Sequence, residues 1–533
     1  MSRLFIALLL AATAHSADPV SANRIRANTK FLSSDLLEGR GVGTRGDKLT
    51  TEYLATQLAL AGAKPAGDNG TFFQKVPLIG VTTEPSASLS AVSAEQTIQF
   101  RWLQDFIGAS HRQGNLTEFQ AEAVFVGHGI VAPEQGWDDY KGTDVRGKIV
   151  VLFTNEPQSG DPALFGGRAL TYYGRWTYKY EEALRQGALG AIIIHTDATA
   201  GYGWEVVRNS WAREDPQVEL KPGQTALGFA GWLTRQAGER LVGLARLKID
   251  ELLALSDSRD FRPIALGVRI KGRIPAKIRP VETRNVAALI PGSDPALRDQ
   301  AVLFSAHWDH LGIGEPVDGD AIYNGAVDNA TGCAIVLELA RAWASLPEKP
   351  RRSALFLFVT AEESGLRGSE YYSKHPLVAP GNTAVALNFD AFRPFGRTRD
   401  IVVSGAERTT LWPAVQEAAA RMNFEIKPDP RPEQGLYYRS DHFSFARVGI
   451  PAFSVSLGSE YLGKPAGYGE QLFREFNTKS YHQPSDEFDE NWDFSGLEAV
   501  ARFGFLLGIN AANEPSLPAW NEGDEFQKAR EAK

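Results

Sequence analysis

The stretch AVLFSAHWDH, residues 301–310, decides the fold. It begins as a mostly apolar run of strand length, residues 301–306, and ionisable side chains follow at once. Similar runs occupy residues 354–360, 383–389 and 450–456. Continuous apolar runs of this length are typical of strands that are buried on both faces, so the sequence predicts a sheet covered by helices.

Helical patterns alternate with these strands near residues 332–344, 410–422 and 494–507. This alternation favours a parallel or mixed sheet, because a crossover helix returns the chain to the edge where the previous strand began. The expected fold class is therefore α/β, with a mixed, largely parallel sheet flanked by helices. At 533 residues the chain is too long for one ordinary core, and we expect two domains.

Ionisable residues follow three of these strands, and the carboxyl ends of strands are where open α/β sheets form their functional sites. A turn bounded by glycines and a late loop supply two further candidates. Together these segments give the candidate metal ligands, which are His307, Asp309, His310, Asp328, Glu362, Glu363, Asp390 and His482.

The candidate ligands are imidazoles and carboxylates, and the single cysteine, Cys333, is not among them. Such donors suit catalytic zinc, and manganese or cobalt fits them as well. Three carboxylates, Asp328, Glu363 and Asp390, oppose the four positive charges of two divalent ions, and a bridging hydroxide would balance the remainder. Two ions about 3.5 to 4 Å apart share a carboxylate and a water and polarise a scissile carbonyl. Glu362 is then the candidate general base, because neighbouring side chains diverge on extended backbone.

Five segments together resemble one family. They are SAHWDHLG at 305–312, DNATG at 328–332, AEESGLRGS at 361–369, NFD at 388–390 and YHQPSD at 481–486. They are similar to segments of the co-catalytic zinc exopeptidases related to secreted bacterial aminopeptidases, which have transferrin-receptor-like relatives. The resemblance implies two zinc ions per chain, one held by His307 and Asp390 and the other by Glu363 and His482. It also implies that Asp328 bridges the ions and that Glu362 is the general base.

The resemblance assigns some neighbouring residues too. Asp309 would orient His307 without binding a metal, and His310 is not expected to be a ligand. Tyr481 matches a tyrosine that stabilises the tetrahedral intermediate in some members, and a role in packing is the other interpretation. Arg439 belongs to a segment near the substrate pocket, where contact with substrate and support of the fold are both open.

The expected domains are discontinuous. The peptidase domain comprises residues 18–117 and 265–515, and residues 118–264 resemble a smaller, β-rich α/β protease-associated domain inserted into it. Residues 516–533 form a C-terminal tail. Three tryptophans of the insert are expected either in its core or in a lid that admits only short peptides: Trp204, Trp211 and Trp232.

The N-terminus predicts export. Residues 1–17 carry one arginine, a short apolar run and small residues, which is typical of a secretory signal peptide, so a secreted or periplasmic location is expected. The apolar run is too short to span a bilayer, and no other segment reads as transmembrane. The 64 acidic and 56 basic residues are scattered without long runs, which disfavours nucleic acid and a polybasic membrane surface as partners.

The expected function is that of a metal-dependent aminopeptidase acting on peptide substrates. Carboxypeptidase or dipeptidase action on the same site is the nearest alternative, although the sequence shows no arginine cluster that clearly recognises a substrate carboxylate. Glutaminyl-cyclase-like acyl transfer is a second alternative, and it typically uses one zinc ion. A receptor-like module without catalysis is disfavoured because no ligand is missing.

Overall fold

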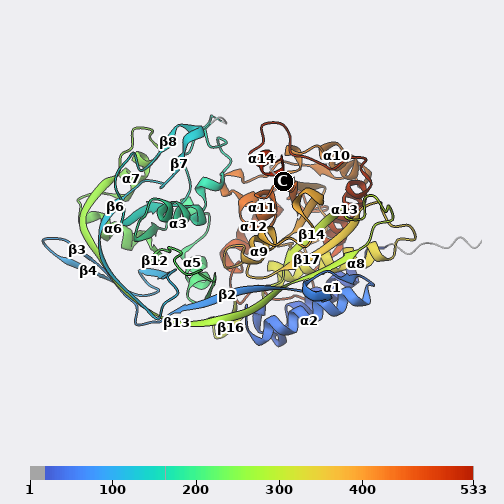
Figure 1. Cartoon of the computed structure of the whole chain (residues 1–533), viewed down its shortest axis with the longest axis horizontal. Coiled ribbons are helices and arrows are strands. Elements are labelled where there is room, and N and C mark those ends of the chain that lie inside the picture. Colours follow the sequence, from blue (N-terminus) through green and yellow to red (C-terminus); the bar gives the residue numbers. More distant parts are fainter. Residues whose placement is uncertain (1–18, 162–163, 532–533) are drawn as a thin grey trace, which may run out of the picture.

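The computed structural model describes residues 19–161 and 164–531. Two lobes lie side by side, and a long ribbon along one edge joins them (Figure 1). This ribbon consists of β2 (Phe73–Thr83) and β13 (Ile264–Ile290), which pair antiparallel. β13 has 27 residues, and its first half pairs with strands of one lobe while its second half pairs with strands of the other. A single strand thus belongs to both sheets.

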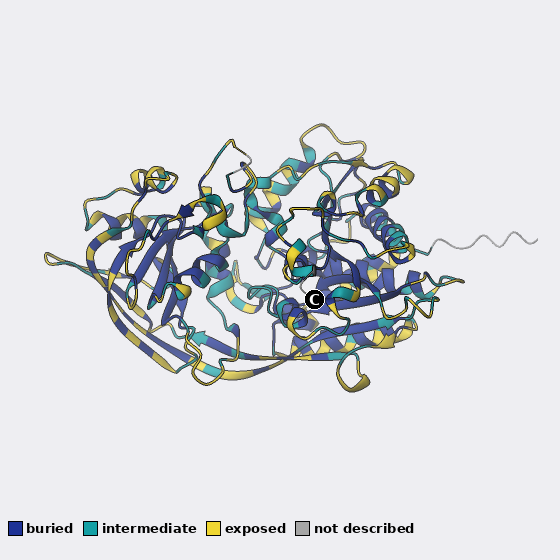
Figure 2. Ribbon diagram, turned by 45° about the horizontal axis from the view of Figure 1, so that its top comes forward, coloured by how far each residue is buried: buried dark blue, intermediate teal, exposed yellow. Residues whose placement is uncertain are grey.

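The sheet of the larger lobe is mixed, with four parallel strands at its centre in the order β17, β14, β18, β21. Their bounds are Ser353–Val359, Ala301–His307, Thr383–Phe389 and Ala452–Leu457. Every residue of β14, β17 and β18 is buried, which confirms the prediction of strands covered on both faces (Figure 2). Further strands of this sheet are β1 (Lys64–Pro65), β11 (Asp215–Val218), β19 (Asp400–Ser404) and β20 (Glu425–Ile426).

Alternate residues of β14 enter different cores. Val302 and Phe304 face a core that also contains residues of α1 (Ala22–Leu32), α2 (Arg45–Leu60), α8 (Thr331–Ala344), α10 (Trp412–Arg421) and α13 (Ser495–Asn513). Ala301 and Leu303 face a second core with residues of α9 (Arg367–Lys374) and α11 (His442–Ala446). The predicted helices near 332–344, 410–422 and 494–507 are present.

The smaller lobe has its own sheet, in the order β4, β3, β13, β6, β9, β10, β12, β5. The bounds of its other strands are Thr97–Phe100, Ser88–Val92, Leu116–Phe125, Ile149–Phe153, Gly190–Ile194, Phe229–Leu233 and Phe106–Ala109, in that order without β13. Its helices include α3 (Trp176–Arg185), α5 (Trp204–Trp211), α6 (Arg235–Gly243) and α7 (Ile249–Ser256).

The strand pairing moves the start of the smaller lobe. The predicted insert begins at residue 118, yet β3, β4 and β5, at residues 88–109, already lie in the sheet of the smaller lobe. The sequence did not reveal this boundary, because β2 runs on from one lobe into the other without a linker.

The C-terminal segment also differs from the predicted tail. Trp520 and Phe526 are buried in the core that contains α9 and α11, and the indole nitrogen of Trp520 donates to the Gly449 carbonyl. A short helix, α14 (Gln527–Glu531), follows. The predicted signal peptide lies outside the described residues. Within residues 19–161 and 164–531, no helix combines the length and the apolar character that crossing a membrane requires.

Candidate metal centre

Three neighbouring strands deliver the candidate ligands to one edge of the sheet. His307 is the last residue of β14, Asp390 directly follows β18, and Glu363 stands in the loop after β17. Because β17, β14 and β18 are parallel neighbours, their carboxyl ends meet, as the sequence predicts. Asp328 enters from the turn before α8, and His482 enters from the loop after α12 (Tyr468–Lys479).

The five residues form two half-sites that share Asp328. In one, His307 Nε2 lies 3.1 Å from Asp328 Oδ1 and 3.2 Å from Asp390 Oδ1. In the other, His482 Nε2 lies 2.9 Å from Glu363 Oε2 and 3.6 Å from Asp328 Oδ2. Asp328 therefore turns one carboxylate oxygen to each histidine, and ligand atoms of His307, Asp328 and Glu363 all lie within 4.8 Å of one another.

Both imidazole rings are held through the nitrogen that faces away from the carboxylates. His307 Nδ1 is 3.1 Å from the Asp309 carbonyl oxygen, so this nitrogen carries the hydrogen and donates it. His482 Nδ1 is 2.9 Å from Ser210 Oγ. With Nδ1 engaged on each ring, both Nε2 atoms are free to bind a cation.

The turn that carries Asp328 is fixed by side chains from distant segments. The carboxylate of Asp486 accepts from the backbone N–H groups of Val327 and Asp328, at 2.9 and 3.1 Å. The side chain of Asn329 donates to the Phe389 carbonyl, which ties the turn to β18. Gly332 is required here, because a Cβ atom would lie 2.2 Å from both the Asn329 side-chain oxygen and the Phe389 carbonyl. The bridging position of Asp328 is thus set by the fold.

A buried acid, Asp309, holds the loop that carries the base candidate. The Asp309 carboxylate accepts from the backbone N–H groups of Glu362 and Glu363, at 3.1 and 3.4 Å, and lies 3.8 Å from His307 Nδ1. Asp309 therefore holds the loop of both glutamates, whereas its backbone carbonyl orients His307. Burial raises the pKa of Glu362 well above its usual range; the charge of His307 opposes this rise and that of Glu363 adds to it.

Electrostatics favours cations between these residues. Burial alone would lower the pKa of His482, but the negative charges of Glu363 and Asp328 outweigh it and raise this pKa to about 9. Burial acts in the same way on His307, and Asp390 and Glu362 raise its pKa well above the usual range. The carboxylates thus favour a positive charge beside each ring, and a cation bound at Nε2 would supply it in place of a proton.

The donor set fits zinc. Three carboxylates and two imidazole nitrogens are gathered in a buried site, and His482 Nε2 lacks a hydrogen-bond partner of good geometry within the described chain. Nitrogen and oxygen donors of this kind are those that catalytic zinc uses.

Four positioning contacts were not found from the sequence. His310 Nδ1 is 2.6 Å from Glu363 Oε1, whereas His482 lies against the other carboxylate oxygen, Oε2. Ser440 Oγ donates to Asp390 Oδ2 at 2.6 Å. Ser210 and Asn209 of α5 contact His482, the first at Nδ1 and the second at the carbonyl oxygen. His310 stands inside the quoted segment 305–312 and Ser440 directly follows Arg439, so both were within reach, whereas nothing in the sequence marked residues of the smaller lobe.

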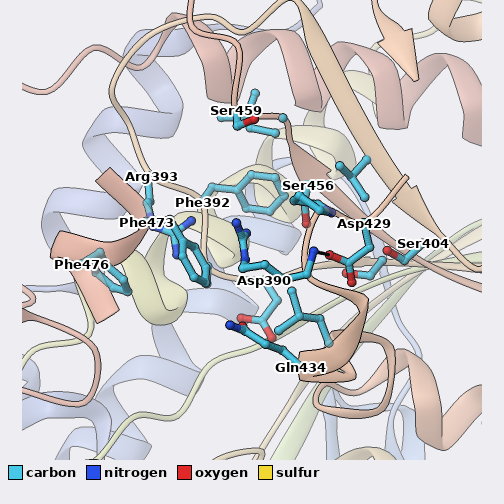
Figure 3. Close-up of a pocket in the computed structure, with 18 of the residues that line it drawn as sticks. Asp390, Phe392, Arg393, Ser404, Asp429, Gln434, Ser456, Ser459, Phe473 and Phe476 are labelled. Carbon is cyan, nitrogen blue, oxygen red and sulfur yellow. Dashed lines mark hydrogen bonds between the residues drawn. The ribbon is translucent and has the colours of Figure 1, made fainter. Parts of the chain in front are cut away.

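Two cavities meet at the centre. The first, of about 490 Å³, is lined by Asp328, Asp390 and aromatic and charged side chains, and Figure 3 shows Asp390 beside Phe392 and Arg393 in it. The Arg393 guanidinium lies 4.9 Å from the ring centres of both Phe473 and Phe476.

The second cavity, of about 300 Å³, is lined by residues of both lobes. Glu362, Glu363, Tyr481 and Arg439 line both cavities. Two tryptophans of the smaller lobe line the second cavity, Trp211 and Trp232. Trp232 is a buried core residue, whereas Trp211 is partly buried.

Comparison with known proteins agrees with this geometry. Residues 285–503 match the family described as Peptidase family M28, and this segment contains all five candidate ligands and Glu362. A probable zinc metalloprotease of Pyrenophora teres f. teres (strain 0-1) is 34% identical over 113 residues, which are 21% of this chain and 23% of that protein. Leupeptin-inactivating enzyme 1 of Streptomyces exfoliatus is 26% identical over 250 residues, 45% of this chain and 52% of that protein. The chain thus matches about a quarter of the first relative's length and about half of the second's.

Among solved structures, an aminopeptidase from Aneurinibacillus sp. strain AM-1 is similar over 95% of this chain and 97% of that chain. The TM-score is 0.55 and the sequence identity is 20%, so the likeness is one of fold. It confirms the predicted fold class across the chain.

Proposed function

Since residues 285–503 match Peptidase family M28, we propose that this chain is a zinc-dependent exopeptidase, and specifically an aminopeptidase that uses two zinc ions. One observation carries the proposal: Asp328 offers one carboxylate oxygen to each of two half-sites, His307 with Asp390 and Glu363 with His482. A carboxylate shared in this way is the arrangement that two-metal hydrolases require.

The residues divide the work of hydrolysis between them. Zinc bound in the two half-sites would lower the pKa of a water and polarise the scissile carbonyl. Glu362 takes a proton from the attacking water as the new C–O bond forms, and returns it to the leaving amine nitrogen when the C–N bond of the tetrahedral intermediate breaks. Its loop is held by Asp309. The ring centres of Tyr481 and His482 lie 4.0 Å apart. The Tyr481 hydroxyl donates a hydrogen bond to the developing oxyanion.

The choice of an aminopeptidase rests on the family resemblance, and a direct comparison of substrates tests it. We expect the zinc-loaded protein to release the first residue of peptides with a free amino terminus and to leave their N-acetylated versions intact, as read by mass spectrometry. Equal cleavage of both sets would overturn the aminopeptidase assignment and favour a carboxypeptidase. Release from dipeptides alone would indicate a dipeptidase.

Metal content separates the remaining alternatives. Two zinc ions per chain by elemental analysis support the proposed site and disfavour a glutaminyl-cyclase-like enzyme, for which one ion and pyroglutamate formation are expected. Two ions without any turnover would favour a receptor-like module. Replacement of zinc by manganese or cobalt should preserve activity if the donor set does not select strongly among these metals.

The remaining assignments are proposals of the same kind. The smaller lobe is proposed to be a protease-associated domain that narrows access to the centre, and the chain is proposed to be exported through residues 1–17. Arg439 is proposed to contact substrate, because it lines both cavities.

A further inference from the structure

Four arginines line the second cavity with Glu362 and Tyr481, and two of them, Arg175 and Arg439, come one from each lobe. Arg175 belongs to the smaller lobe, where it directly precedes α3. Arg439 belongs to the larger lobe, three residues before the start of α11. They are separated widely in the sequence, and only the apposition of the two lobes brings them to one cavity.

Neither arginine has a carboxylate partner among the residues that the structure describes. The Nε atoms of both are buried and make no hydrogen bond within the described chain, and neither guanidinium forms an ion pair with a described residue. Arg439 donates a hydrogen bond from Nη2 to the Ala200 carbonyl at 3.1 Å. Its guanidinium carbon lies 5.5 Å from the centre of the Tyr202 ring. Most arginines that are withdrawn from water pair with an acid, because an unpaired buried charge is costly.

The two charges also act on each other. Burial lowers the pKa of Arg175 to about 10, and the next largest cause is the positive charge of Arg439. Two like charges placed together in a partly desolvated cavity favour the entry of an anion.

Three acids of the cavity do not supply that anion, because each of them already has a partner. Glu181 accepts from the hydroxyl of Tyr172 at 2.8 Å. Asp215 accepts from the side-chain amide of Gln217 at 2.9 Å. Glu370 pairs with Lys374 at 2.6 Å. The remaining carboxylates, Glu362 and Glu363, are assigned to catalysis and to the metal.

We propose that Arg175 and Arg439 together bind a carboxylate of the substrate on the leaving-group side of the scissile bond, so that short peptides with a free C-terminus, dipeptides above all, are preferred. Planar guanidinium groups bind carboxylates through paired N–H donors, which gives both affinity and orientation. The inference rests on the proposed peptidase function. The α-carboxylate of a dipeptide and an acidic side chain of the leaving residue offer the same chemistry.

The test compares three substrates, Leu-Gly, Leu-Gly amide and Leu-Glu amide, with the zinc-loaded full chain. We expect kcat/KM for Leu-Gly to exceed that for Leu-Gly amide by about tenfold or more, the scale of a charged hydrogen bond that is lost. Arg175→Gln and Arg439→Gln should bring this ratio close to one. Arg175→Lys should restore it only in part, because an ammonium cannot make the paired contact.

Arg146→Gln serves as the matched control, since Arg146 lies in the smaller lobe with 79% of its side chain exposed and pairs only with Asp144. It should leave the ratio unchanged. If kcat/KM for Leu-Glu amide exceeds that for Leu-Gly amide while Leu-Gly and Leu-Gly amide are cleaved equally well, the site binds an acidic side chain. The proposal is wrong if the unaltered protein cleaves Leu-Gly and Leu-Glu amide no faster than Leu-Gly amide. It is also wrong if both glutamine variants, at full zinc content, keep the preference of the unaltered protein.

Loss of the proposed function would be seen separately. If none of the three substrates is cleaved, the peptidase assignment fails, and calorimetric titration with Leu-Gly and Leu-Gly amide still tests the arginines. Tighter binding of Leu-Gly that disappears in Arg175→Gln would support the carboxylate site, and equal binding of the two ligands would refute it.

Discussion

Glu362 lies beside the candidate ligands and does not share their contacts. It lines both cavities, its loop is fixed by Asp309, and no hydrogen bond to another described residue occupies its carboxylate. Its neighbour Glu363 is engaged by His310 and His482. Two adjacent glutamates thus have different surroundings and, in our proposal, different tasks.

Replacing Glu362 with glutamine separates chemistry from metal binding. The amide keeps the shape of the side chain but cannot accept a proton, so we expect kcat to fall by about 10²- to 10⁴-fold while zinc content stays at two ions per chain. Steady-state kinetics and elemental analysis of the purified variant measure both. Substantial turnover at full zinc content would remove Glu362 as the base.

Asp328→Ala is expected to do the opposite. Since Asp328 faces both half-sites, at 3.1 Å from His307 and 3.6 Å from His482, its loss removes a donor from each ion. We expect the variant to retain less than two zinc ions after dialysis and to lose activity in proportion. A variant that kept both ions would show that Asp328 is not the bridge.

His442 gives a prediction about stability rather than catalysis. Its ring is buried, both ring nitrogens lack a hydrogen-bond partner in the described chain, and burial lowers its pKa to about 3. Between pH 6.5 and about 3 the unfolded chain therefore binds a proton that the folded chain does not. This residue alone should lower the free energy of unfolding by about 1.4 kcal/mol for each pH unit of acidification.

Urea unfolding of the metal-free protein at several pH values, with and without His442→Gln, measures this slope. We expect the variant to lose stability less steeply between pH 6.5 and 4.5, whatever its absolute stability. Identical slopes would mean that His442 takes up its proton in the folded state too.

At the scale of single elements, α5 links the smaller lobe to the metal centre. Ser210 Oγ contacts His482 Nδ1 at 2.9 Å, and Asn209 donates to the His482 carbonyl at 3.1 Å. An eight-residue helix of one lobe thus fixes the ring of a ligand carried by the other.

Ser210→Ala should weaken zinc binding in the half-site of Glu363 and His482. Loss of a partner behind a metal-bound histidine typically costs 10- to 100-fold in metal affinity, and we expect a change of that order by competition with a chelator. Ser88→Ala, on an exposed position of β3, is the control and should leave the affinity unchanged. If both variants bind zinc equally well, the contact does not support the ligand.

At the scale of the whole molecule, the two lobes act as one unit because β13 runs through both sheets and the second cavity is lined from both sides (Figure 1). Thr83 and Ala276 are cross-strand partners, so a two-residue Asn-Gly turn can join them in place of residues 84–275. The larger lobe keeps its two main cores in this shortened chain.

The shortened chain tests what the smaller lobe contributes. We expect it to fold but to bind zinc at least tenfold more weakly, because His482 loses Ser210 and Asn209, and to show no preference for a free carboxylate, because Arg175 is absent. Chelator competition and the dipeptide comparison measure these two losses. Wild-type affinity together with a wild-type preference would mean that the lobe is only a cover.

The sequence by itself predicted the parallel strands of the larger lobe and six residues that the structure brings together at their carboxyl ends. Apolar runs such as Ala301–Ala306 are long enough to identify buried strands, and ionisable residues that follow parallel strands are brought together by the sheet itself. Only the tertiary structure shows which side chains from distant segments hold those residues in place, and where one lobe ends and the other begins. Ser210 lies 272 residues from His482 in the sequence, and the pairing of β3 with β13 places the lobe boundary where no linker marks it. Contacts of this kind depend on how two lobes pack, and packing between distant segments leaves no periodic trace in either one.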